Sequence, residues 1–151
     1  MGNFDRERAQ RVWQRVQTAQ PEMPVVQPAQ QLLGWILEEW QTGQRYIALQ
    51  GQLPSGHSRM LKEMVKEKQA QVACLKGIYR IMTGSQPKVA TVAPKIEPAA
   101  NLLRKCYGSL MRSLAWYDGV SHDPEYGSAY NRLAQQNRTH CQSILTLLGK
   151  L

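Results

Sequence analysis

Apolar side chains recur every three or four residues in five stretches of the chain, the spacing that places them on one face of an α-helix. Proline and glycine residues separate these stretches, because neither favours the interior of a helix. The expected helices cover residues 5–20, 29–50, 58–83, 99–118 and 126–148. No stretch alternates apolar and polar residues over the length of a strand, so the pattern predicts an all-α protein.

The lengths of these helices predict how they pack. Four of them are long and of similar length, and prolines mark an irregular connection over residues 85–98. Matched helices with two short connections and one long crossover are typical of an antiparallel four-helix bundle. We therefore expect residues 29–151 to form the bundle, and residues 1–28 to form an outer N-terminal helix and a proline-rich linker.

Polar residues interrupt the apolar face of three of these helices near its middle. In the helix over residues 29–50, Glu39 lies seven residues after Leu32 and seven before Tyr46. In the helix over residues 58–83, Lys68 and Gln71 interrupt the apolar face formed by Leu61, Met64, Leu75, Ile78 and Met82. In the helix over residues 126–148, Asn137 and His140 interrupt the face formed by Tyr130, Leu133, Ile144 and Leu147. Burying an unpaired polar group costs several kcal/mol, so three interruptions at one depth need a common explanation.

The motifs around these positions resemble the ferritin-like superfamily, and most closely the small rubrerythrin-like proteins of anaerobic bacteria. In that family a glutamate followed seven residues later by a tyrosine lies on the first bundle helix, as Glu39 and Tyr46 do here. The residues that follow the family's motif on its second helix are matched here by Leu75, Ile78, Tyr79 and Gly84. The resemblance covers most of the chain after Ala29 and implies the ferritin-like fold.

The family's metal ligands are mostly replaced in this sequence. Functional members carry Glu-x-x-His on the second and fourth helices, and use two irons to reduce peroxide or to oxidise and store iron. The corresponding positions here are Lys68 and Gln71 on the second helix, and Asn137 and His140 on the fourth. The family's third helix supplies another carboxylate, whereas residues 99–117 contain no Asp or Glu and Leu110 or a neighbour takes that place. Only Glu39 and His140 are kept of six ligands, so the resemblance implies a degenerate site without a di-iron centre or other cofactor.

A charge substitution explains these replacements. Lys68 occupies a ligand position that faces Glu39, so its ammonium group is expected to neutralise the carboxylate where a metal would otherwise do so. Gln71, Asn137 and His140 would then complete a buried hydrogen-bond network, with Tyr46 and Leu110 as supporting residues. The alternative is that each amide or imidazole is an ordinary core residue and that Lys68 and Glu39 both reach solvent.

The formal net charge of +8 adds a second feature. The outer face of the helix over residues 58–83 carries basic residues at helical spacing, namely Arg59, Lys62, Lys66, Lys76 and Arg80. Such a face suits nucleic acid or an acidic partner, but a solvated helix face is the commoner explanation, and Glu63 and Glu67 offset part of its charge. The sequence has no recognition-helix signature, aromatic platform or glycine-rich phosphate loop, so nucleic acid is the weaker alternative.

These observations favour a structural or interaction protein built on a degenerate bundle. The alternatives are a redox or iron-handling protein with a residual metal site at Glu39 and His140, and a basic binding module. No apolar run approaches the roughly 20 residues of a membrane span, and the first residues lack a signal core, so we expect a cytoplasmic bacterial protein without a membrane partner. Cys74, Cys106 and Cys141 form neither a disulfide framework nor a zinc ligand set. A homodimer through an apolar helix face remains open, and no protein partner is identified.

Overall fold

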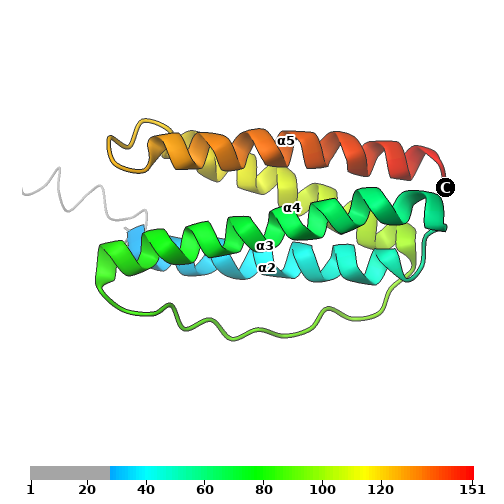
Figure 1. Cartoon of the computed structure of the whole chain (residues 1–151), viewed down its shortest axis with the longest axis horizontal. Coiled ribbons are helices and arrows are strands. Elements are labelled where there is room, and N and C mark those ends of the chain that lie inside the picture. Colours follow the sequence, from blue (N-terminus) through cyan, green and yellow to red (C-terminus); the bar gives the residue numbers. More distant parts are fainter. Residues whose placement is uncertain (1–27) are drawn as a thin grey trace, which may run out of the picture.

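The computed structural model describes residues 28–151, which form four α-helices and no strand (Figure 1). The helices are α2 (Pro28–Gln50), α3 (Ser55–Thr83), α4 (Ala99–Gly119) and α5 (Gly127–Gly149). The all-α class expected from the periodicity is confirmed for this part of the chain. The expected helix over residues 5–20 lies outside the described residues.

Local signals account for the ends of the helices. Residue Gly84 ends α3 in the left-handed conformation, with a φ of 72°, and its N–H donates to the carbonyl of Arg80. Pro54 and Pro98 precede α3 and α4, and their carbonyls accept the first hydrogen bonds of those helices. Pro54 is the N-cap of α3, and its carbonyl accepts from the His57 N–H at 2.9 Å, so the helix begins at Ser55 rather than at the expected Ser58.

Two short turns and one long connection arrange the helices (Figure 1). Turns over residues 51–54 and 120–126 join α2 to α3 and α4 to α5. The segment over residues 84–98 runs back along the outside of the helices from the end of α3 to the start of α4, as the proline spacing predicts. Helix α2 packs against α3 and α4, and α5 packs against α4 and α3.

The interior contains two apolar clusters with a polar layer between them. One cluster includes Leu49, Leu61, Leu103 and Ile144, and the other includes Leu32, Leu75, Tyr117 and Leu133. Burial of these side chains supplies the main driving force for packing the helices together. Met82, which the helical pattern placed on the buried face, is 37% exposed because it lies in the last turn of α3, beyond the second cluster.

None of the four described helices is both long enough and apolar enough to cross a membrane.

Candidate functional site

Every helix of the bundle contributes polar side chains to the layer between the two apolar clusters. All of these side chains are at most 1% exposed, and they comprise Glu39 of α2, Lys68 and Gln71 of α3, Ser113 and Tyr117 of α4, and Asn137 and His140 of α5. We call this set the polar layer. Buried groups of this kind are tolerated only when their hydrogen bonds are satisfied, so the partners of each group decide what the layer can do.

Lys68 lies at the centre of the polar layer. Its Nζ donates to Glu39 Oε2 at 3.1 Å, to Gln71 Oε1 at 2.8 Å and to Asn137 Oδ1 at 2.7 Å. Three acceptors around one nitrogen require three N–H donors, which only the protonated amine provides. Burial lowers the pKa of Lys68 from its ordinary value of 10.5, and the charge of Glu39 opposes that change. The geometry therefore describes a buried ammonium–carboxylate pair.

Within the described residues, the carboxylate of Glu39 accepts hydrogen bonds on one oxygen only. Oε2 accepts from Lys68, from the Tyr117 hydroxyl at 3.2 Å and from Asn137 Nδ2 at 3.2 Å. Oε1 is buried and has no hydrogen-bond partner among residues 28–151. Three donors on a single oxygen hold the carboxylate in one orientation.

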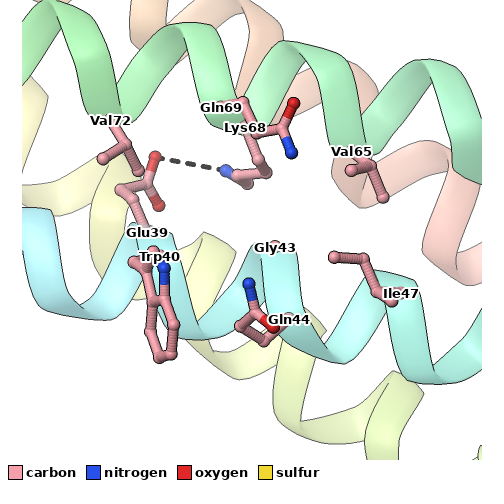
Figure 2. A pocket seen from close by; sticks show the side chains of 9 residues that line it. All are labelled: Glu39, Trp40, Gly43, Gln44, Ile47, Val65, Lys68, Gln69 and Val72. Atoms are coloured by element: carbon pink, nitrogen blue, oxygen red, sulfur yellow. Dashed lines mark hydrogen bonds and ion pairs between the residues drawn. The ribbon is translucent and has the colours of Figure 1, made fainter. Parts of the chain in front are cut away.

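A small cavity of about 140 Å³ lies beside this pair, between α2 and α3 (Figure 2). Glu39 and Lys68 face each other across the gap, while Val65, Val72 and Ile47 supply apolar walls. Gly43 lies directly against the lysine stem, since a Cβ at that position would be in ordinary van der Waals contact, 3.4 Å from the Cβ of Lys68. A donor that entered the cavity could satisfy Glu39 Oε1, and the cavity is large enough for water.

Helix α4 enters the polar layer through residues that sequence reasoning missed. Ser113 Oγ accepts from Asn137 Nδ2 at 2.8 Å and donates to the carbonyl of Leu110 at 2.6 Å, and Tyr117 reaches Glu39. The side chain of Leu110 belongs instead to an apolar cluster, so its expected supporting role is carried by its backbone carbonyl alone. The signal was present, since Ser113 and Tyr117 follow Leu110 by three and seven residues and share its helix face.

His140 lies at the edge of the polar layer and has its own partners. Its Nδ1 lies 3.1 Å from the Tyr46 hydroxyl, and its Nε2 lies 2.9 Å from Glu67 Oε2. A carboxylate can only accept, so Nε2 carries the proton and donates to Glu67. In the neutral ring Nδ1 then accepts from the Tyr46 hydroxyl, whose pKa burial raises well above its ordinary value. Burial lowers the pKa of His140, the nearby Lys68 charge lowers it further, and the bond to Glu67 opposes both.

The lowered pKa of His140 predicts how stability depends on pH. As the pH falls through the ordinary value of 6.5, the unfolded chain takes up a proton on this residue that the folded protein resists. The stability present above that pH is therefore lost on acidification. We expect His140→Gln, which cannot titrate there, to lose less stability than the wild type between about pH 7.5 and about pH 5. Denaturant midpoints of both proteins measure this difference, and parallel losses would contradict it.

The basic face of α3 lies away from the polar layer. All five of its residues, Arg59, Lys62, Lys66, Lys76 and Arg80, are exposed. Lys66 forms a 3.5 Å ion pair with Glu63, in which both side chains are 62% exposed. Such a pair contributes little to stability.

The donor set of the polar layer does not fit a di-iron centre. Glu39 is its one carboxylate, and its nearest cation is the Lys68 ammonium. Both ring nitrogens of His140 are engaged by Tyr46 and Glu67, so in this arrangement neither nitrogen is free to bind a metal together with Glu39. Within residues 28–151, no group of three or more His, Cys, Asp or Glu side chains has the arrangement of a metal site. Two adjacent iron ions need several anionic oxygen ligands, which this layer lacks.

Comparisons of the chain with protein-family models, with curated proteins and with solved structures found no match.

Proposed function

We propose that this protein is a degenerate ferritin-like bundle of the rubrerythrin-like type, with a structural or interaction role in place of metal chemistry. The four helices, the long connection between α3 and α4 and the polar layer at mid-depth support this fold assignment. The Glu39 and Tyr46 pair on α2 keeps the spacing of the family's first helix. In this proposal the bundle is retained as a scaffold after its metal ligands are lost.

One observation carries the proposal, namely that the Lys68 ammonium lies 3.1 Å from Glu39 and is fully enclosed. A fixed positive charge repels a metal cation and already neutralises the carboxylate that would bind it. Removing either partner alone would leave a buried, uncompensated charge, so a substitution of Glu39 or of Lys68 by itself would destabilise the folded protein. The layer then holds the four helices in register through hydrogen bonds instead of through a metal.

The chemistry of the remaining groups supports a non-catalytic role. The Lys68 ammonium has no lone pair with which to attack a substrate while it is protonated. Burial raises the pKa of Tyr117 well above its ordinary value and raises the pKa of Cys106 to about 12, so neither group supplies an anion near neutral pH. The layer therefore offers hydrogen bonds and fixed charges but no activated nucleophile.

The residual-metal alternative, in which Glu39 and His140 bind a single ion in a redox or iron-handling protein, predicts a different outcome in solution. It requires His140 to exchange its bonds to Tyr46 and Glu67 for a metal ligand bond, and Lys68 to leave the carboxylate. The two proposals are therefore separated by whether the purified protein retains metal.

We expect wild-type protein from cells grown with added iron to retain well below one iron per chain, as measured by elemental analysis. The positive control is the triple variant Lys68→Glu, Gln71→His and Asn137→Glu, which restores two Glu-x-x-His motifs around Glu39 and His140. This variant is expected to bind ferrous or zinc ions and to gain thermal stability on their addition, because metal binding to the folded state stabilises it. Stoichiometric iron in the wild type that Glu39→Gln removes would overturn the proposal.

A further inference from the structure

A second concave site lies between α2 and α4, on a different pair of helices from the cavity beside Lys68. It is an open groove of about 430 Å³, and its lining is formed by Arg45 of α2 and by Arg104, Lys105, Gly108, Ser109 and Arg112 of α4. We call it the cationic groove. Four of its six lining residues carry a positive charge, and none of them belongs to the polar layer's central pair.

The sequence of α4 accounts for this concentration of charge. Arg104, Gly108 and Arg112 are spaced four residues apart and so lie along one face of the helix. No acidic residue occurs from position 99 to position 117 to offset them. Gly108 keeps the floor of the groove low, and a Cβ placed there would lie 3.5 Å from Arg112 Nη1, which places that guanidinium over the glycine.

Two of the guanidinium groups are held in place by one buried hydroxyl. Ser109 Oγ accepts from Arg45 Nη1 at 3.2 Å and from Arg112 Nη2 at 3.1 Å. Glu38 Oε1 also accepts from Arg112, at 2.8 Å from Nε and 2.6 Å from Nη2. These contacts orient the guanidinium groups of Arg45 and Arg112, which come from different helices, toward Ser109. They use only some of the N–H groups of the two side chains. Side chains restrained in this way lose less conformational entropy when a ligand binds.

The positive charge of the cationic groove is only partly neutralised. Lys105 pairs with Glu97 at 2.7 Å, and Arg112 pairs with Glu38. Arg45 and Arg104 form no ion pair with a carboxylate within residues 28–151. Like charges that converge in a concave site repel one another, and a bound anion would remove this repulsion.

We propose that the cationic groove binds the phosphate groups of a small ligand, such as a diphosphate or a phosphomonoester. Guanidinium forks match the geometry of phosphate oxygens, and arginine from two helices together with Lys105 can contact several oxygens of one such group. The lining contains no aromatic side chain on which a nucleobase could stack, so the groove recognises the phosphate and not a base. The inference is independent of whether Lys68 replaces a metal.

The test is a calorimetric titration of the full chain with inorganic pyrophosphate at constant ionic strength. We expect saturable binding of one pyrophosphate per chain by the wild type. Arg45→Gln with Arg104→Gln should weaken it at least about tenfold, because charged hydrogen bonds to the ligand are lost. The matched control is Arg59→Gln with Lys62→Gln on the basic face of α3, which changes the net charge equally but leaves the groove intact, and it should bind like the wild type.

A further variant, Gly108→Glu, keeps every cation and places a carboxylate on the floor of the groove. It should also lose pyrophosphate binding, and a melting curve for each variant shows that the protein is folded. Absence of saturable binding by the wild type, or equal weakening in the α3 control, would overturn the proposal. So would binding of a short single-stranded oligonucleotide in the groove that pyrophosphate cannot displace, since the groove would then serve a nucleic-acid backbone.

Discussion

Lys68→Ala is expected to destabilise the protein by about 3–5 kcal/mol, the typical cost of breaking a buried ion pair from one side. This is a large share of the roughly 5–15 kcal/mol that stabilises a domain. Among residues 28–151, the substitution removes the one cation that forms an ion pair with Glu39, and it leaves the carboxylate enclosed in the bundle. It also leaves the side-chain oxygens of Gln71 and Asn137 without the donor that now lies 2.7–2.8 Å away.

The matched control for this prediction is Lys66→Ala. Lys66 lies two residues earlier on the same helix, is largely exposed and forms a long surface pair with Glu63, so its loss should cost less than about 0.5 kcal/mol. Denaturant midpoints at neutral pH measure both effects. Glu39→Gln combined with Lys68→Met removes both charges together and should regain much of the stability lost in Lys68→Ala. Equal midpoints for the two single lysine variants would mean that Lys68 reaches water, and the charge-substitution proposal would be wrong.

The second large effect is expected for Asn137→Leu. Asn137 accepts from Lys68, and its Nδ2 lies within hydrogen-bond distance of both Glu39 and Ser113. Leucine has a similar volume but no polar atom, so the substitution leaves parts of three buried polar groups unsatisfied at about 1–3 kcal/mol each, more for charged groups. Rearrangement of the neighbouring side chains reduces the sum of these costs, and we expect the free energy of unfolding to fall by about 3 kcal/mol.

Gln135→Leu provides the comparison for Asn137→Leu, because Gln135 is exposed on the same helix two residues earlier. The chemical change is nearly the same, and the expected effect on the free energy of unfolding is within about 0.5 kcal/mol. Urea unfolding with matched slopes measures the difference. A cost for Asn137→Leu no larger than that of the control would show that the polar layer is not held together by this amide.

The positions of the bundle helices could be predicted from the sequence by itself. Apolar spacing and proline and glycine punctuation placed α2, α4 and α5 within one residue of their observed ends, because these signals act locally along the chain. The same periodicity placed Glu39, Lys68 and Asn137 on buried faces at mid-helix, where each is at most 1% exposed. The position of a residue along its helix and the face on which it lies depend on that helix alone, so both can be predicted from the sequence.

The partners of these residues were decided only by the tertiary structure. Periodicity carries no information about the axial and rotational register between helices, which depends on how side chains of different helices interlock. For that reason the sequence, although it places Ser113 and Tyr117 on the helix face of Leu110, could not show that they bond to Asn137 and Glu39, or that His140 bonds to Glu67. The cationic groove is likewise formed only when packing brings Arg45 against a helix more than fifty residues away in the chain.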